Sequence, residues 1–189
     1  MVEIRYIGVP SDERDLAGLF EILCACQHEF VPPLCARTGS AQKFQAGRLK
    51  GDGNDRPVAY FEEMRRQHFV VARADGGRLA AFLTFKPRYT CPELRSYGEN
   101  IYMTTACVLP AWRGRGLSGG LYDVVEGALP AALSTPYVTT RTWSTHQTQM
   151  HVFPKRGYEI CARLKDDRGA GIDTVYFAKR ILAPTAPGT

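Results

Sequence analysis

The chain has 189 residues, of which 44% are hydrophobic and 23% are charged; this is the size and composition of one globular domain and excludes a wholly disordered chain. Its apolar runs are far shorter than the roughly 20 residues of a membrane helix, and the charged residues near its start leave no room for the apolar segment of a secretory signal. The formal net charge of +5 suits an anionic ligand or nucleic acid but decides for neither. We therefore expect a soluble, cytoplasmic domain with no membrane partner.

The first half of the chain predicts a strand, two helices and a hairpin. Asp12, Glu13 and Asp15 are typical of a helix N-terminus, and the apolar residues that follow recur at helical spacing. The turn Asp75-Gly76-Gly77 separates two apolar runs, as in a hairpin. The expected elements are a strand over 3–9, a helix from 12 that ends at 31–33, a polar, glycine-rich excursion over 34–58 with one short helix, a helix over 57–67, and hairpin strands over 68–73 and 79–86.

The second half alternates strands and helices. The expected elements are a loop over 87–98, a long strand over 100–109, an amphipathic helix over 117–129, a strand over 137–143, a short helix over 147–156, and two last strands over 158–164 and 174–180. Hairpins and strand–helix–strand units both occur, so the pattern predicts an α/β fold with a mixed sheet.

The six cysteines are expected to be reduced thiols, because the chain is not small and carries no export signal. Cys24, Cys26 and His28 could suggest a metal site. However, residues two apart on a helix point to different faces, and no second pair of ligands completes a set of four. We therefore expect no metal.

The segment Arg113-Gly114-Arg115-Gly116-Leu117-Ser118-Gly119 follows the long strand and opens the next helix. Glycines let a backbone approach a ligand closely, and the free N–H groups of a helix start, together with the helix dipole, attract phosphate groups. Arg113 and Arg115 add positive charge. The segment therefore predicts a phosphate or pyrophosphate site, and the alternative is a simple glycine turn with two solvated arginines.

Gly114, Gly116 and Gly119 also satisfy the dinucleotide fingerprint G-x-G-x-x-G. In a dinucleotide fold, however, the strand ends at the first glycine, and an acidic residue ends the next strand. Here 109–112 intervene, and the strand over 137–143 ends without Asp or Glu. A dinucleotide-binding oxidoreductase is therefore the weaker alternative. The four arginines at 65, 66, 73 and 78 form no tight run with aromatic residues, so we expect no nucleic-acid partner.

The sequence resembles the GNAT acetyltransferases. Val108-Leu109-Pro110 and the run 113–118 match the acyl-CoA loop of that family, in which Ser118 replaces a small Gly or Ala, and the run 152–158 resembles its later signature Leu-Tyr-x-Lys-x-Gly-Phe. The order of elements agrees over about 3–180. The resemblance implies one N-acetyltransferase domain over 1–189, with a tail at 181–189. It also implies a mostly antiparallel mixed sheet flanked by helices.

The resemblance further implies a gap between the strands at 100–109 and 137–143 that holds acetyl-CoA as co-substrate. The pantetheine arm would bind the backbone at Ala106, Cys107 and Val108, and the pyrophosphate would lie on the amides of Arg113, Gly114, Arg115, Gly116, Leu117, Ser118 and Gly119. The acetyl group would pass directly to the amine of a small molecule. A monomer and a homodimer both fit the sequence.

Direct transfer needs a group that takes the proton of the amine. Tyr102 occupies the strand position at which some relatives hold a glutamate base. A phenol with an ordinary pKa near 10 is a poor base, so packing or contact with the substrate is at least an equal alternative. Glu99, just before the strand, is the preferred base. Its alternative is a solvated loop carboxylate.

Phe153 occupies the position of the tyrosine that, in relatives, protonates the departing CoA thiolate; it can pack against the pantetheine arm but cannot donate a proton. His146 lies seven residues earlier and is the candidate acid, because imidazole titrates near neutral pH. The alternative is that His146 caps the helix or bonds the cofactor, while water protonates the thiolate. The missing tyrosine also leaves open a protein that binds acyl-CoA without turnover.

Overall fold

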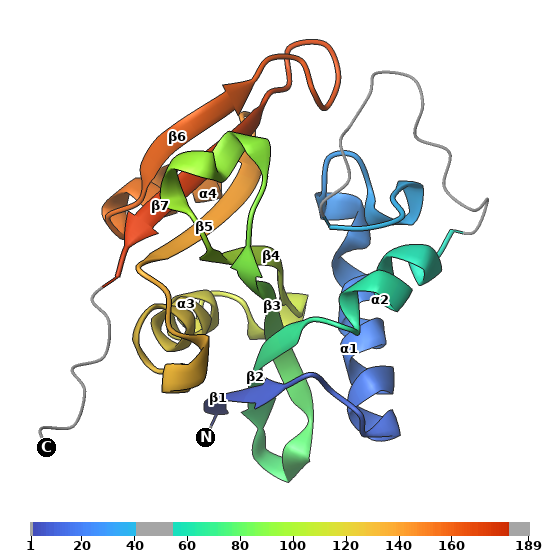
Figure 1. Cartoon of the computed structure of the whole chain (residues 1–189). Helices are drawn as coiled ribbons and strands as arrows, with labels where there is room; N and C mark the ends of the chain where they lie inside the picture. The colour runs from blue at the N-terminus through green and yellow to red at the C-terminus, as the bar shows by residue number, and fades with distance from the viewer. Residues whose placement is uncertain (1, 41–54, 182–189) are drawn as a thin grey trace, which may run out of the picture.

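The computed structural model describes residues 2–40 and 55–181, and its strands form one seven-stranded sheet (Figure 1). The strand order is β1-β2-β3-β4-β5-β7-β6. Every neighbouring pair is antiparallel except β4 and β5, which are parallel. The strands are β1 (Val2–Gly8), β2 (His68–Ala74), β3 (Leu79–Tyr89), β4 (Asn100–Val108), β5 (Tyr137–Trp143), β6 (Glu159–Leu164) and β7 (Thr174–Arg180).

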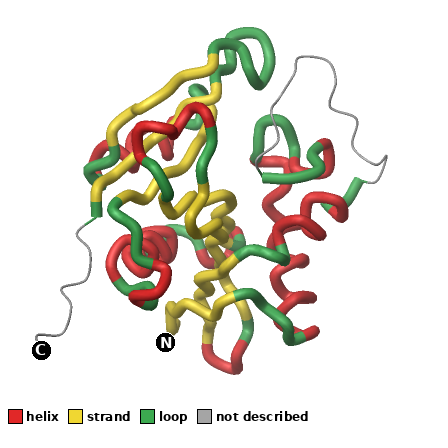
Figure 2. Tube along the Cα trace, in the orientation of Figure 1, coloured by secondary structure: helices red, strands yellow, loops and turns green. Residues whose placement is uncertain are grey.

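Helices cover both faces of the sheet (Figure 2). They are α1 (Glu13–Cys26), α2 (Val58–Met64), α3 (Leu117–Gly127) and α4 (Gln147–Lys155). One apolar cluster packs α3 and α4 on the sheet through residues such as Leu121 and Phe153, and a second packs α1 and α2 on the other face through residues such as Leu19 and Tyr60. The central strands are therefore buried between helices, whereas the edge strands β1 and β6 are partly exposed.

The pairing of β4 and β5 is short, and this creates the gap that the site needs. Backbone register links Ile101 to Val138 and Met103 to Thr140, and it ends there. The hydroxyl of Thr140 donates a hydrogen bond to the carbonyl of Met103 at 3.1 Å, which marks the last contact of the ladder. Beyond this point β4 continues to Val108 without β5 as its partner.

A β-bulge at Thr104 changes which side chains of β4 face each helical layer. Thr84 of β3 pairs with Thr105 and Phe85 pairs with Met103, so Thr104 is the extra residue. Its hydroxyl lies 2.6 Å from that of Thr84. As a result, Tyr102 and Thr105 face the same side of the sheet, although an uninterrupted strand would turn them to opposite faces. Tyr102 packs there with Leu94 and Tyr176, and Thr105 is hydrogen-bonded to Tyr60 of α2.

The expected elements and their order are confirmed, with changes at some boundaries. β3 continues to Tyr89, because the Asn100 side chain donates to the carbonyl of Tyr89 at 2.9 Å and extends the pairing. The expected loop after it contains a 3₁₀ helix over Pro92–Tyr97, and α3 ends at Gly127 rather than at 129. The first helix ends at Cys26 rather than at 31–33, and a 3₁₀ helix over Gln27–Glu29 follows it. Residues 41–54 of the polar excursion, and 182–189 of the expected tail, lie outside the described residues. Within the described ranges no helix is long and apolar enough to cross a membrane.

Candidate active site

Two glycines shape the turn that leads into α3. Gly114 and Gly116 have φ angles of 73° and 76°, in the left-handed region that glycine adopts most easily. A Cβ at either position would meet no atom within 4 Å, so the backbone conformation, rather than lack of space, requires glycine. Gly116 is the N-cap of α3, and its carbonyl accepts the first helical hydrogen bond, from the amide of Gly120 at 3.1 Å.

The first amides of α3 border an open hollow of about 120 Å³. The N–H groups of Leu117, Ser118 and Gly119 precede the first donor of the helical ladder, so the helix itself does not use them. The residues that line the hollow are Val108, Trp112, Arg113, Gly114, Gly116, Leu117, Ser118 and Gly119. Free amides at the positive end of a helix dipole suit a phosphate group.

The two arginines of the turn are held by neighbouring side chains and backbone. Arg113 donates from Nε to the carbonyl of Val108 at 3.1 Å and forms an ion pair with Glu29 at 2.6 Å, and the bond to Glu29 raises the pKa of Arg113. The guanidinium of Arg115 lies 4.8 Å from the ring centroid of Trp112. Arg113 therefore braces the turn, and Arg115 lines neither the hollow nor the larger cavity beside it.

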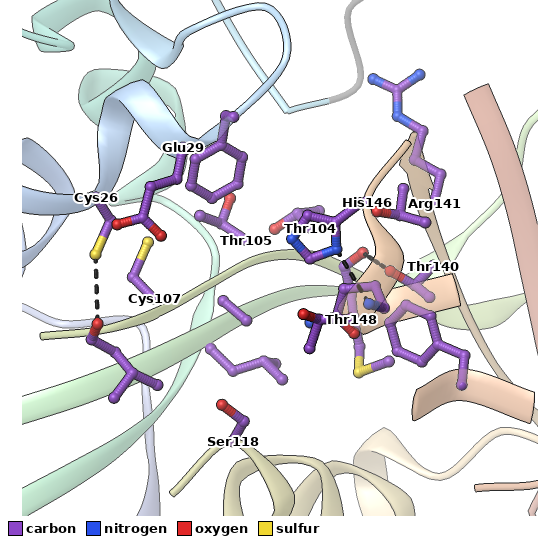
Figure 3. Close-up of a pocket in the computed structure, with 18 of the residues that line it drawn as sticks. Cys26, Glu29, Thr104, Thr105, Cys107, Ser118, Thr140, Arg141, His146 and Thr148 are labelled. Atoms are coloured by element: carbon purple, nitrogen blue, oxygen red, sulfur yellow. Dashed lines mark hydrogen bonds between the residues drawn. The ribbon is translucent and has the colours of Figure 1, made fainter. Parts of the chain in front are cut away.

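The larger cavity has a volume of about 310 Å³ and lies where β4 and β5 separate (Figure 3). Its walls come from the ends of both strands, the start of α3, α4 and the segment after α1. Val108, Arg113 and Ser118 line both the cavity and the hollow, so the two spaces adjoin. An elongated ligand with an anionic group at one end could therefore occupy both.

Most of the predicted cofactor residues lie along these two spaces. Ala106, Cys107 and Val108 line the cavity from β4, on the part of the strand that β5 does not pair. Phe153 lines it from α4; it is 3% exposed and lies within 5.2 Å of the ring centroid of Tyr158. Of the predicted cofactor residues, only Arg115 falls outside both spaces.

Neither Glu99 nor Tyr102, the two candidate bases, lines the cavity. Glu99 is exposed, lies before the start of β4 and pairs with Arg88 at 3.0 Å. Tyr102 is 1% exposed and stacks on Tyr89 with ring centroids 4.3 Å apart, and burial raises its pKa strongly. Both precede the point at which β4 leaves β5, so neither lines the gap.

His146 lines the cavity and is the N-cap of α4. Its Nδ1 accepts a hydrogen bond from the backbone N–H of Gln149 at 3.2 Å, and its ring meets Trp143 edge-on with centroids 4.3 Å apart. Burial lowers the pKa of His146. Its neutral form is therefore favoured, with the proton on Nε2, and the capping role is the one that the geometry supports.

Sequence reasoning missed two pairs of residues in the cavity. Tyr122 of α3 shares a hydrogen bond with Gln149 of α4, and both line the cavity. Helical spacing contained a signal, since Tyr122 lies one turn after Ser118. Cys26 and Cys107 also meet there: a hydrogen bond from Cys107 lowers the pKa of Cys26, whereas burial raises that of Cys107. All six cysteines are free thiols. Among the residues described, no group of three or more His, Cys, Asp or Glu could hold a metal ion.

Comparison with solved structures finds the same fold in acetyltransferases. YncA of Salmonella typhimurium, assigned as an acetyltransferase and solved with its cofactor acetyl-CoA, has a TM-score of 0.61 at 15% identity, over 100% of this chain and 99% of that one. A protein assigned as a phosphinothricin N-acetyltransferase has a TM-score of 0.62 at 14% identity, over 96% of this chain and 99% of that one. The ribosomal-protein-S18-alanine N-acetyltransferase of Escherichia coli has a TM-score of 0.60 at 13% identity, over 100% of both chains.

A comparison with curated protein sequences gives no match. The family model for the acetyltransferase (GNAT) family, by contrast, matches residues 40–158. This match covers more than half of the chain and includes the long strand, the glycine turn and both helices that border the cavity. The chain therefore belongs to the GNAT acetyltransferase family.

Proposed function

We propose that this protein is an acetyl-CoA-dependent N-acetyltransferase that moves an acetyl group directly to the amine of a small molecule. The observation that carries the proposal is the cavity between β4 and β5, which adjoins the hollow at the start of α3 through Val108, Arg113 and Ser118. A coenzyme with a pyrophosphate and a long, thin thiol arm fits these two adjoining spaces, with the pyrophosphate in the hollow and the arm in the cavity.

The chain's residues fit each part of acetyl-CoA. The amides from Leu117 to Gly119 would hold the pyrophosphate. Gly114 and Gly116 beside them have no side chains that could block the ligand. The edge of β4 at 106–108 that β5 does not pair would form hydrogen bonds with the amides of the pantetheine arm, as it would with a neighbouring strand. When bound, the coenzyme supplies an acetyl thioester, and YncA, of the same fold, is solved with acetyl-CoA.

The size of the cavity favours a small acceptor. Its volume of about 310 Å³ lies at the lower end of the range for small-molecule sites, and it must hold the thiol arm of the coenzyme as well as the acceptor. Phe30 and Trp143 line its wall with ring centroids 5.9 Å apart. Acceptors differ widely among proteins of this fold: one structural neighbour is assigned to phosphinothricin and another acts on a ribosomal protein. The small-molecule acceptor is therefore part of the proposal, and the experiment below tests it.

In direct transfer, the amine nitrogen attacks the thioester carbonyl while both substrates are bound, and the C–S electron pair leaves with sulfur. The chain would orient both reactants in a space that excludes bulk water, which removes much of the entropic barrier. Cys107 is poorly suited to a covalent route, because burial keeps it protonated by raising its pKa.

The test is a panel of small amines and N-terminal peptides incubated with acetyl-CoA, with release of free thiol as the readout and mass spectrometry of the acceptor as confirmation. Acetylation of one or more small amines, with no acetylation of the peptides, supports the proposal. Acetylation of peptides alone would move the acceptor to a protein N-terminus. If the protein binds acetyl-CoA but no amine releases thiol, the alternative of a binding protein without turnover is favoured.

A further inference from the structure

Tyr122 and Gln149 form a hydrogen-bonded pair in the wall of the cavity, and the proposed reaction needs a group of that kind. When the C–S bond of the thioester breaks, negative charge appears on the sulfur. We propose that the hydroxyl of Tyr122 donates a hydrogen bond to this departing sulfur, and that Gln149 positions the hydroxyl. This inference rests on the proposed function and names a residue that acts in it.

The position of Tyr122 supports this role. It lies in α3, is 3% exposed and lines the cavity together with Ser118 from the first turn of the same helix. Its ring centroid is 5.7 Å from that of Phe153, which lines the same cavity from α4. The phenol of Tyr122 is thus adjacent to the side chain that, at position 153, has no polar group to offer.

The hydroxyl of Tyr122 has both of its hydrogen bonds with the amide of Gln149. Nε2 of Gln149 donates to the phenolic oxygen at 3.0 Å, and the phenolic O–H donates to Oε1 at 3.2 Å. The O–H contact is the longer of the two, and in the proposed role the O–H exchanges Oε1 for the departing sulfur while Nε2 continues to donate. The same donation stabilises negative charge on the oxygen, which makes the O–H a stronger donor.

Several other polar groups of the cavity already have partners. Arg141 donates to the hydroxyl of Tyr176 and to the carbonyl of Ser40. His146 uses Nδ1 to cap α4, and its lowered pKa disfavours the cationic form that would donate a proton. Glu29 is an acceptor that is already paired with Arg113. Cys107 is hydrogen-bonded to Cys26. The hydroxyls of serine and threonine are weaker donors than a phenol because they are less acidic.

The pKa of Tyr122 decides between a hydrogen-bond donor and a true acid. Burial raises it to about 12, although the bond from Gln149 and the charge of Arg156 act in the opposite direction. A thiol has a pKa near 8.5, so full transfer of the phenolic proton to the thiolate is unfavourable. Tyr122 keeps its proton, the C–S electron pair stays on sulfur, and the proton lost by the amine neutralises the thiolate.

Three variants test the role: Tyr122→Phe, Phe153→Tyr and the two combined. Tyr122→Phe keeps the ring and removes only the hydroxyl, and we expect kcat to fall about a hundredfold, the lower range for loss of one transition-state donor. KM for acetyl-CoA should change little, because the interaction forms only as the bond breaks. Phe153→Tyr returns a phenol to the adjoining ring position. The kcat of the combined variant should therefore be at least about tenfold higher than that of Tyr122→Phe alone.

Gln149→Leu is the matched control, because it removes the partner of the phenol but leaves the phenol in place. We expect its kcat to fall less than that of Tyr122→Phe. An unchanged kcat for Tyr122→Phe overturns the inference. So does an equal loss in Tyr122→Phe and Gln149→Leu without rescue by Phe153→Tyr, because the pair would then only tie α3 to α4.

Binding of acetyl-CoA, measured by the rise in melting temperature, separates this inference from the proposed function. If the variants bind acetyl-CoA as the wild type does, a lower kcat reports on the chemical step. A wild-type protein that neither binds acetyl-CoA nor releases thiol with any amine defeats the proposed function, and the role of Tyr122 with it. A wild-type protein that is active, with Tyr122→Phe equally active, defeats only the role of Tyr122.

Discussion

Arg113 is bonded to the end of the strand that precedes it: its Nε donates to the carbonyl oxygen of Val108 at 3.1 Å. The same guanidinium pairs with Glu29 beyond α1, so three segments meet at one side chain. The geometry indicates that this arginine fixes the shape of the glycine turn rather than binding phosphate by its charge.

We therefore expect Arg113→Met to weaken binding of acetyl-CoA about tenfold without changing how binding depends on salt. A direct ion pair with the pyrophosphate would be screened by salt, and its loss would reduce that dependence. Calorimetric titration at two salt concentrations measures both quantities. A clearly smaller salt dependence in the variant would show that Arg113 contacts the ligand through its charge.

The second prediction concerns Gly116. Acetyl-CoA at a hundredfold excess over its Kd should stabilise the protein by about 2–3 kcal/mol, visible as a higher melting temperature. Gly116→Val should abolish this shift, because a β-branched residue does not adopt the positive φ of the turn. The expected cause is thus the backbone of the turn, and not contact of the side chain with the protein.

Gly127→Ala is the control for that experiment. Gly127 lies at the end of α3, away from the hollow, and a Cβ there meets no atom within 4 Å. The variant should keep the full shift with acetyl-CoA. Stabilisation by NADH in place of acetyl-CoA would instead support the dinucleotide-binding alternative.

The third prediction concerns the order of chemical events. Direct transfer requires both substrates at once, so initial rates at varied concentrations of each should give intersecting lines. Cys107→Ala and Cys26→Ala should each keep most of the activity, because neither thiol is needed as a nucleophile. Parallel lines together with an inactive variant at either position would indicate an acyl-enzyme.

The fourth prediction concerns His146. Asparagine is a good N-cap, so His146→Asn should keep kcat within about threefold, whereas His146→Ala should lose about 1 kcal/mol of stability. Thermal unfolding and steady-state kinetics measure the two effects. A fall of roughly a hundredfold in kcat for His146→Asn, with KM for acetyl-CoA unchanged, would make His146 the acid after all.

The pH dependence of stability gives a further check on His146. Burial lowers its pKa in the folded state, so the unfolded chain binds more protons and stability rises with pH. Its contribution is present above the unfolded value, near 6.5, and is lost as the pH falls below it. His146→Asn should therefore show a smaller fall in melting temperature between pH 7 and pH 5 than the wild type.

The fold and most of the residues that line the hollow and the wall of the cavity along β4 were predictable because their signals are local. The two glycines at 114 and 116 lie beside a helix start, and the residues of β4 follow one strand pattern. The position of Glu99 relative to the cavity was not predictable, because it depends on where β4 stops pairing with β5, at Met103 and Thr140. Pairing between strands that lie far apart in the chain leaves no mark in a local pattern.

The same limit explains why the pair formed by Tyr122 and Gln149 was missed. The two residues lie on different helices, and only the packing of α3 beside α4 places the phenol against the amide. Each taken alone has an ordinary explanation: a tyrosine on an amphipathic helix, and a glutamine in the first turn of another. The predictable part of the site was therefore its backbone, and the side chains from several elements needed the structure.

The extra residue at Thr104 makes the end of β4 intolerant of changes in length. Deleting it would restore strict alternation along the strand and turn every later side chain over. Cys107, which now packs on α1, would face α3, and Ala106 and Val108 would face α1. Homologous chains should therefore accept insertions and deletions in the turn at 75–77 far more readily than between 101 and 108, where a single lost codon would invert the wall of the cavity.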